Sequence, residues 1–389
     1  MLRIVADENI PLLEPFCGGL GRLTRVNGRT LGRDQLMDAD VLLVRSVTRV
    51  DASLLAGTPV RFVGTATIGT DHVDTDWLAE QGIAFTPAPG CNASSVVQYV
   101  LSVLSLFLFH HQQPSFHGLT VGVVGAGNVG GALVRRLQAL GVTVRVSDPP
   151  LQVQGAEMPF ASLDEVLECD VISLHTPLTG GGPHATAHLL DEGRLSRLRG
   201  NQLLINSGRG PVIDNQALLR RLNEPDAPTV VLDVWENEPE PLPALVDRCW
   251  LATPHIAGYS LEGKSRGTEM VARALHQWVG VSMETDLAAV LPVPPLTELR
   301  FTARATPMEA LHRALMACYD PRDDDARLRA ACTDTAGPGS PLGPAFDGLR
   351  KAYPVRREPA SLKVVVPAAS GQGAPLAAAG FQVIETPGP

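Results

Sequence analysis

Three side chains of the kinds that transfer protons and bind carboxylates each follow an apolar run in the second half of the sequence. Arg209 lies in "INSGRGPVID", Glu238 in "LDVWENEP" and His255 in "TPHIAGY". Because the carboxyl ends of parallel strands meet at one edge of a sheet, we expect these side chains to converge. The guanidinium of Arg209 suits the carboxylate and 2-oxygen of a 2-hydroxy acid. His255, oriented by Glu238, can accept the hydroxyl proton as hydride leaves C2.

Each of the three residues also has a common structural role. A lone loop histidine more often caps a backbone or lies on the surface, an arginine often forms a surface ion pair, and a glutamate often begins a helix. Their joint placement after three separate apolar runs favours the catalytic interpretation over these roles.

A glycine-rich segment indicates the cofactor. "GAGNVG" follows the apolar run "TVGVV" and opens a helical pattern, and Asp148 ends the next run, "VTVRVSD". The glycines allow a tight turn and let a pyrophosphate approach the helix N-terminus, while the carboxylate can bind the adenosine ribose and repel a 2'-phosphate. A methyltransferase can also carry such a turn, but the whole pattern favours NAD. The predicted cofactor contacts here are Gly125, Gly127, Asn128, Val129, Gly130 and Asp148.

Composition restricts the class of protein. The net charge of -9 argues against a large basic face, so we expect no nucleic-acid partner. Six scattered cysteines lack CxxC or zinc spacing, which indicates reduced thiols and no metal site. The first ten residues are acidic rather than signal-like, and the apolar run at 96–109 is shorter than the about 20 residues of a spanning helix. We therefore expect a buried core helix, no membrane partner and a cytoplasmic protein.

The order of apolar runs predicts the fold class. Short β-branched runs separated by helical lengths ("LRIVA", "ADVLLVRS", "VRFVGTA", "IAFTPA") indicate a parallel α/β sheet, and a second series from residue 119 indicates another. The proline-rich "LPVPPL" marks a boundary before a small α+β region. We predict an α/β protein with two Rossmann-like, doubly wound parallel-sheet domains and a small C-terminal α+β domain. The tail after residue 367, rich in Ala, Gly and Pro, cannot be placed.

These motifs resemble the D-isomer-specific 2-hydroxyacid dehydrogenases, in which an Arg, a Glu and a His occupy the positions of the three residues above. "HTPLT" and "VLDVWENEP" are similar to the cofactor segments of that family. "ADENIP", "VRSVTRV", "FVGTATIGTDHVD", "APGCNA" and "HIAGYSLEGKSRGT" resemble more closely one bacterial subfamily that works in pyridoxal 5'-phosphate biosynthesis. The resemblance implies NAD-dependent oxidation, at C2, of a small phosphorylated 2-hydroxy acid.

The resemblance also implies domains, partners and further site residues. It implies a substrate domain at 1–95 with 257–290, an NAD domain at 96–256, and a C-terminal domain at 291–389 that forms a homodimer. Substrate contacts are implied at Ser46, Thr67, Arg209 and Tyr259. Further cofactor contacts are implied at Thr176, Ser207, Gly208, Arg209, Asp233 and Gly258.

Two alternatives and one charged run stay open. A 3-phosphoglycerate or other D-2-hydroxyacid dehydrogenase would share the same three residues, and a non-enzymatic NAD-binding corepressor or sensor can share the fold. The basic run of Arg350, Lys351, Arg356 and Arg357 has two interpretations. It is a solvated face or the rim of a dimer interface, or else one arginine, Arg350, reaches the substrate phosphate.

Overall fold

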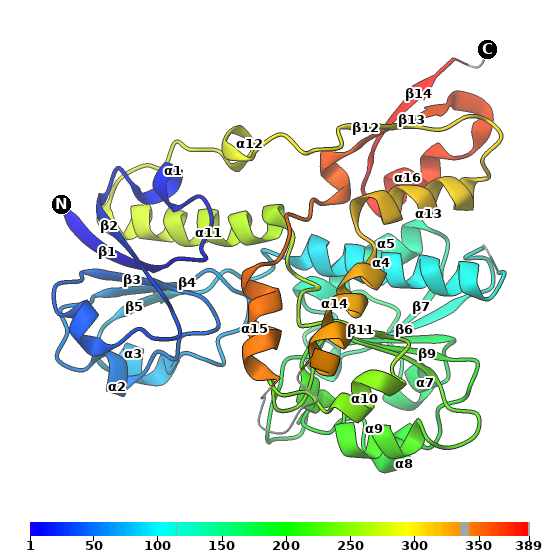
Figure 1. The fold of residues 1–389 in the computed structure, drawn as a ribbon, viewed down its shortest axis with the longest axis horizontal. Coiled ribbons are helices and arrows are strands. Elements are labelled where there is room, and N and C mark those ends of the chain that lie inside the picture. The colour runs from blue at the N-terminus through cyan, green and yellow to red at the C-terminus, as the bar shows by residue number, and fades with distance from the viewer. Residues whose placement is uncertain (114, 335–341, 388–389) are drawn as a thin grey trace. The chain divides into compact units, whose positions relative to one another are not determined.

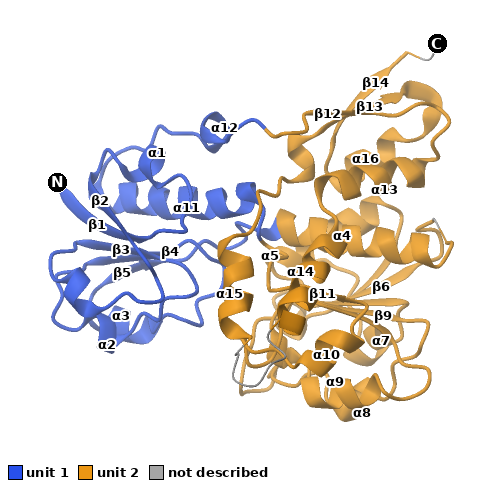
Figure 2. Cartoon of the chain, in the orientation of Figure 1, with its two compact units in different colours: residues 1–93, 259–293 blue, residues 94–258, 294–389 orange. Residues whose placement is uncertain are grey.

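The computed structural model describes residues 1–113, 115–334 and 342–387, which form three parallel sheets (Figure 1). The chain divides into two compact units (Figure 2). Unit 1 comprises residues 1–93 and 259–293, and unit 2 comprises residues 94–258 and 294–389. The predicted fold class is confirmed, and the strands of the small third sheet are parallel as well.

Unit 1 contains a five-stranded sheet with the order β2-β1-β3-β4-β5. Its strands are β1 (Leu2–Asp7), β2 (Gly21–Val26), β3 (Val41–Val44), β4 (Phe62–Thr65) and β5 (Ala84–Thr86). Four of them coincide with the predicted apolar runs. β2 was not predicted from the sequence, because this edge strand carries polar side chains and is only partly buried.

Both faces of this sheet are covered, each by its own hydrophobic cluster. On one face Val271 and Leu275 of α11 pack with Ile4, Leu43 and Phe62. The helical segments of unit 1 are α1 (Leu13–Cys17), η1 (Arg33–Leu36), α2 (Ala52–Leu55), α3 (Thr75–Glu80), α11 (Leu261–Val279) and α12 (Leu287–Val290). One face of the sheet therefore depends on a helix that follows residue 259 in the chain.

The larger sheet of unit 2 has the order β11-β10-β9-β8-β6-β7. Its strands are β6 (Thr120–Val124), β7 (Thr143–Ser147), β8 (Val171–Leu174), β9 (Leu203–Asn206), β10 (Thr229–Leu232) and β11 (Leu251–Ala252). Its helical segments are α4 (Ala93–His110), α5 (Asn128–Ala139), α6 (Pro149–Val153), α7 (Leu163–Leu167), α8 (Glu192–Leu195), η2 (Gly210–Val212), α9 (Asn215–Arg221) and α10 (Pro243–Arg248).

Helix α4 is the apolar run that the sequence predicts as a core helix. By length and composition it could cross a membrane, but 78% of it is buried inside the protein. Nearly every residue from Ser95 to Leu108 is buried. The core-helix prediction is confirmed.

The C-terminal region builds the third sheet and also packs on the larger one. The sheet consists of β12 (Glu298–Arg300), β13 (Lys363–Pro367) and β14 (Gln382–Thr386). Its helical segments are α13 (Pro307–Cys318), α14 (Pro321–Asp334), α15 (Gly343–Lys351), η3 (Pro359–Ser361), η4 (Ala368–Ser370) and α16 (Gly373–Ala379). Leu328 of α14 and Phe346 of α15 are fully buried in the core cluster of the larger sheet. The tail that the sequence leaves unplaced forms α16 and β14.

Candidate active site

The glycine-rich loop joins β6 to α5 and has room for a ligand. Gly125 has a φ of +82°, a conformation that other L residues rarely adopt. A Cβ on Gly130 would lie 1.9 Å from the carbonyl oxygen of Gly125, so only glycine allows this close packing of helix on strand. A Cβ on Gly127 would instead point into open space. The loop thus brings bare backbone to the N-terminus of α5, as a pyrophosphate requires.

Two side chains beside the loop have spare capacity for hydrogen bonds to a dinucleotide. Thr176 follows β8, and its Oγ1 is buried with no hydrogen-bond partner among the described residues. Asp148 follows β7; its Oδ2 accepts from the Ala126 N–H at 2.8 Å and its Oδ1 from the Leu151 N–H at 3.0 Å. Each carboxylate oxygen keeps a second lone pair, which can accept a ribose hydroxyl. The residues present therefore fit NAD.

His255 and Glu238 form a hydrogen-bonded pair. They follow β11 and β10, which lie on the opposite side of the sheet from β7. The distance from His255 Nδ1 to Glu238 Oε2 is 2.7 Å, and the side chains are 34% and 22% exposed. Glu238 Oε1 also accepts from the Trp235 N–H at 2.8 Å. Burial acts to raise the pKa of Glu238, but His255 and the Trp235 N–H outweigh burial and hold that pKa below its ordinary value. Glu238 is thus an ionised carboxylate that orients the imidazole.

The loop that carries His255 is held by Asp233, at the end of β10. Asp233 is 1% exposed; its Oδ1 accepts from Thr253 Oγ1 at 2.6 Å and from the Ile256 N–H at 2.8 Å, and its Oδ2 accepts from the Ala257 N–H at 2.9 Å. His255 itself has a φ of +56°, which is strained for a residue with a Cβ. The Asp233 bonds fix the backbone on both sides of this strained residue. The predicted contact of Asp233 with NAD stays a prediction.

Arg209 lies beyond the carboxyl end of a third strand, next to the two strands that precede Glu238 and His255. It follows β9, while Glu238 follows β10 and His255 follows β11, and these strands are adjacent in the sheet. Asn206 Nδ2 donates to the Arg209 carbonyl at 3.0 Å, and the Gly208 N–H donates to Asn206 Oδ1 at 3.1 Å. This turn presents Arg209 from the carboxyl edge of the sheet. The three residues therefore lie on neighbouring strand ends, as expected from their positions in the sequence.

His175 lies beneath this edge and stays neutral. Burial lowers its pKa to about 4, and its Nε2 lies 2.9 Å from Ser173 Oγ. Its Nδ1 lies 3.5 Å from Ser207 Oγ, a long contact. His175 is partly exposed and contacts the turn before Arg209. The predicted contacts of Ser207, Gly208 and Gly258 with cofactor stay predictions.

The predicted substrate residues Ser46, Thr67 and Tyr259 all lie in unit 1. Ser46 is exposed just after β3. Thr67 Oγ1 lies 2.7 Å from Thr65 Oγ1, which in turn lies 3.0 Å from His72 Nε2. His72 thus joins the same hydrogen-bonded group as the two threonine hydroxyls. These hydroxyl groups can donate hydrogen bonds to a ligand at the carboxyl end of β4.

Tyr259 is surrounded by positive charge. Lys264 Nζ lies 4.1 Å from the centre of its ring, and Arg45 Cζ lies 5.5 Å from it. Arg45 stands inside the motif "VRSVTRV" and Lys264 inside "HIAGYSLEGKSRGT", but neither was predicted from the sequence as a site residue. The tyrosine ring lets two like charges approach one another, because its electron-rich face attracts both cations. Such a cluster is suited to an anion.

The basic run near the C-terminus is not a solvated face throughout. Arg356 is only 5% exposed, and its three nitrogens donate to Gln98, Ser95 and Ile256. The side chain of Arg350 is 13% exposed and lies 3.9 Å from Asp347. The expectation of a solvated face is therefore wrong for Arg356, because the core of unit 2 supplies enough acceptors to bury a guanidinium.

Comparisons with known proteins agree with this geometry. Residues 108–257 match the family model of the D-isomer specific 2-hydroxyacid dehydrogenase NAD binding domain, and residues 290–380 match a domain of unknown function, DUF3410. Erythronate-4-phosphate dehydrogenase of Marinobacter nauticus is 58% identical over 93% of this chain and 94% of the relative. The enzyme of that name from Pseudomonas aeruginosa is 50% identical over 93% of this chain and 95% of the relative.

Solved structures show the same fold over about three quarters of the chain. D-lactate dehydrogenase of Aquifex aeolicus, complexed with NAD and lactic acid, has a TM-score of 0.58 at 24% identity and covers 72% of this chain and 96% of its own. NAD-bound 3-phosphoglycerate dehydrogenase of Entamoeba histolytica has a TM-score of 0.60 at 20% identity and covers 74% and 98%. At these identities the likeness concerns the fold alone.

Fold, glycine loop and family model agree on the class of protein. The chain belongs to the NAD-dependent D-isomer specific 2-hydroxyacid dehydrogenases. Within that class, by identity over nearly its whole length, it is a member of the erythronate-4-phosphate dehydrogenase family.

Proposed function

We propose that this chain oxidises 4-phospho-D-erythronate at C2 to 2-oxo-3-hydroxy-4-phosphobutanoate, with NAD as the acceptor, in pyridoxal 5'-phosphate biosynthesis. The observation that carries the proposal is the 2.7 Å contact of His255 Nδ1 with Glu238 Oε2. Because Glu238 occupies Nδ1, the substrate hydroxyl is left to Nε2. The family membership supports the identity of the substrate.

In the proposed reaction one C–H bond and one O–H bond break and the C2 carbonyl forms. NAD, when bound, accepts the hydride from C2. His255 Nε2 accepts the hydroxyl proton, and Glu238 stabilises the imidazolium that results. Arg209 holds the substrate carboxylate through its planar fork and polarises the 2-oxygen. The imidazolium later releases its proton to solvent, so the products are the 2-oxo acid, NADH and one proton.

The terminal phosphate is the part of the proposal that distinguishes this substrate from simple 2-hydroxy acids. We assign it to Arg45 and Lys264, which approach the Tyr259 ring at 5.5 and 4.1 Å. Arg45 NH1 also donates to the Asn9 carbonyl at 3.0 Å, which limits the motion of its side chain. Two cations held on one aromatic ring suit a dianion better than a neutral hydroxyl group.

A substrate panel with two variants tests the function. Reduction of NAD, followed at 340 nm, should be much faster with 4-phospho-D-erythronate than with D-erythronate or 3-phosphoglycerate. His255→Asn should lower kcat by roughly a hundredfold or more, the scale of losing a general base, with little change in the Kd of NAD. Turnover of 3-phosphoglycerate at an equal or higher kcat/KM, or no NADH with any acid, would overturn the proposal.

The phosphate assignment has its own matched pair of variants. Arg45→Met should raise the KM for the phosphorylated acid and change the KM of D-erythronate little. Arg33→Met is the control, because Arg33 NH2 also donates to a main-chain carbonyl of unit 1, that of Ser53 at 2.6 Å. Equal effects of Arg45→Met on both acids would remove Arg45 from the phosphate.

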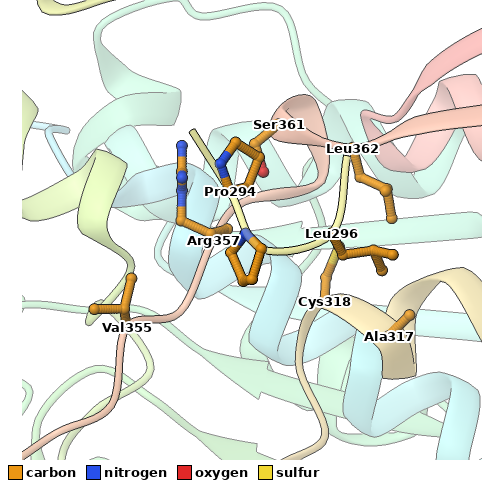
Figure 3. A pocket seen from close by; sticks show the side chains of 9 residues that line it. Pro294, Leu296, Ala317, Cys318, Val355, Arg357, Ser361 and Leu362 are labelled. Atoms are coloured by element: carbon orange, nitrogen blue, oxygen red, sulfur yellow. The ribbon is translucent and has the colours of Figure 1, made fainter. Parts of the chain in front are cut away.

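We also infer a cytoplasmic homodimer formed through residues 291–389. An open hollow on this region is lined largely by apolar side chains, among them Leu296, Val355 and Leu362 (Figure 3). Val355 in this lining is 69% exposed, and a second copy of this chain would cover it. Val355→Asp should shift the protein toward monomer in sedimentation velocity. An unchanged dimer, or a monomeric wild type, would contradict the inference.

A further inference from the structure

Arg356 is a buried arginine in the part of the chain that matches the domain of unknown function. Its Nε donates to Gln98 Oε1 at 3.0 Å, its NH2 to the Ser95 carbonyl at 2.5 Å and its NH1 to the Ile256 carbonyl at 3.4 Å. The guanidinium carbon also lies 3.8 Å from the centre of the Tyr319 ring. A buried charge is costly unless its donors are satisfied, and these contacts use all three nitrogens.

One of these contacts reaches the residue that follows the catalytic histidine. The Ile256 N–H donates to Asp233 at 2.8 Å and the Ile256 carbonyl accepts from Arg356. Both main-chain polar groups of Ile256, the residue after His255, are thus held, one by Asp233 and the other by Arg356. Because His255 has a φ of +56°, its conformation persists only if its surroundings fix it.

A second line of contacts connects the same region to this loop. Tyr99 OH lies 2.9 Å from Thr253 Oγ1, which donates to Asp233. The ring of Tyr99 lies 5.9 Å from that of Tyr319, the ring that Arg356 covers. Glu358 is 3% exposed and accepts a hydrogen bond at 3.0 Å from Oγ of Ser95. Ser95 lies on α4, the helix whose Ser95 carbonyl and Gln98 side chain also accept from Arg356. Arg356 therefore belongs to a buried polar network that ends at the histidine loop.

The neighbours of Arg356 face the other way. Val355 and Arg357 line the open hollow of Figure 3, whereas Arg356 and Glu358 are buried. This alternation is what an extended segment gives when one face packs on a core. The inward face of residues 355–358 thus consists of two charged side chains directed at α4 and the histidine loop.

We infer that Arg356 is a positioning residue for His255, so that the C-terminal region completes the active site of its own chain in addition to any role in assembly. The inference rests on the proposed function of His255 as proton acceptor. Arg356 acts through the Ile256 carbonyl, and it sets the direction of the imidazole rather than touching the substrate. Loss of this bond should displace His255 Nε2 and lower kcat, with small effects on the KM of the acid and the Kd of NAD.

Arg356→Ala and Arg356→Lys test this, with Arg221→Ala as the matched control. Arg221 is also buried, at 8% exposed, and donates to three carbonyls of unit 2, those of Leu198, Pro225 and Asp226. All three variants should lower the thermal midpoint, but only the Arg356 variants should lower kcat, by roughly ten- to a hundredfold. Guanidinium chloride at low millimolar concentration should partly restore kcat to Arg356→Ala and not to Arg356→Lys.

A spectroscopic readout keeps the inference separate from the choice of substrate. In protein labelled with ¹³C-histidine, the ring signal of His255 is identified by its loss in His255→Asn. Arg356→Lys should shift that signal and Arg221→Ala should leave it in place, even if the wild type fails to oxidise 4-phospho-D-erythronate. An unchanged signal with unchanged kcat, at a stability loss equal to that of Arg221→Ala, would overturn the inference and leave Arg356 a structural residue only.

Discussion

Glu238 contributes both a negative charge and the size of its side chain to the proposed active site. A substitution that keeps the size can separate the two contributions. Its pKa is held low chiefly by His255 against the opposing effect of burial, so the carboxylate is ionised across the working range. Glu238→Gln keeps the size and can still accept from the Trp235 N–H. Without the charge, the imidazolium formed in the proposed proton transfer is stabilised less, so kcat should fall and its dependence on pH should change.

Glu236→Gln is the matched control for this experiment. Glu236 Oε1 forms a second carboxylate–imidazole pair, 2.5 Å from His188 Nε2, in the same loop. Side-chain hydrogen bonding to Glu236 raises the pKa of His188, so this second pair also depends on a carboxylate charge. Only the Glu238 variant should change the activity profile. A dependence of kcat on pH that coincides with that of the wild type would count against the Glu238–His255 pairing in catalysis.

We propose that the side chain of Asp148 selects NAD over NADP, and the same side chain also stabilises the local backbone. Asp148→Ser removes the charge that repels a 2'-phosphate, so the preference for NAD over NADP in kcat/KM should narrow. The same change weakens the cap of α6 and the bond to the Ala126 N–H. Asp191→Ala is the control, because Asp191 caps α8 in the same way and lies outside the glycine loop. An unchanged NAD preference in Asp148→Ser would place discrimination elsewhere.

The sequence allowed the residues that we propose to be catalytic to be predicted, but not those that hold them in place. Arg209, Glu238 and His255 were found because each stands directly after an apolar strand. Arg356 was missed, because a run of basic residues ordinarily indicates a solvated face. Its burial depends on carbonyls that come together only when the chain folds. Asp233 was predicted as a cofactor contact, and its bonds to the histidine loop could not be foreseen from spacing.

Two short helices of unit 1, α2 and α3, are each capped by an aspartate side chain, and α2 offers a direct measurement. Asp51 accepts from the Ser53 N–H at 2.9 Å, and hydrogen bonds from Ser53 and then Arg49 lower its pKa to about 2. Because the folded-state pKa is depressed, the cap stabilises fully above the ordinary pKa of 3.8 and is lost as pH falls toward 2.

Asp51→Ala should lower the free energy of unfolding by about 1 kcal/mol at neutral pH, the usual value of such a cap. The difference from wild type, measured by urea unfolding, should shrink as the pH is lowered below about 4. Asp38→Ala, at a carboxylate that is 94% exposed, should change stability little at any pH. A difference that stayed constant down to pH 3 would mean that the carboxylate charge is not what stabilises α2.

Among the strands, those buried along their whole length were predicted from the sequence, and those only partly buried were not. β3, β4 and β9 read as uninterrupted apolar runs because both of their faces are covered. β2 and β14 are edge strands with exposed positions, so their sequences carry no such run. Helix α16 is rich in alanine and glycine, and its position comes from packing rather than from a hydrophobic pattern.

Unit 1 is assembled from two separated parts of the chain, which a pair of fragments can test. Val271 and Leu275 of α11 are buried against β1, β3 and β4, and each such side chain contributes roughly 1.5 to 3 kcal/mol. Together they contribute about 3 to 6 kcal/mol, which approaches the lower end of the net stability of a small domain, about 5 to 15 kcal/mol. A fragment of residues 1–93 should therefore not fold, whereas 1–93 joined to 259–293 by a flexible linker should.

Circular dichroism and binding of a hydrophobic dye would distinguish the two fragments. The joined fragment should show a cooperative thermal transition and low dye binding. The shorter one should show neither, since Ile4, Leu43 and Phe62 would stay uncovered. A cooperative transition in residues 1–93 alone would mean that α11 is dispensable to this core.

The split of unit 1 has a consequence for the order of events at the ribosome. The strands of the first sheet emerge early, but the helix that covers one of their faces is translated only after all of residues 94–258. At typical rates of synthesis that interval lasts roughly ten to thirty seconds. During that time the apolar side chains of residues 1–93 are exposed to solvent, while residues 94–258 of unit 2 begin to fold. The part of this enzyme that is synthesised first is thus among the last to complete its folding. We expect it to bind chaperones that act during translation.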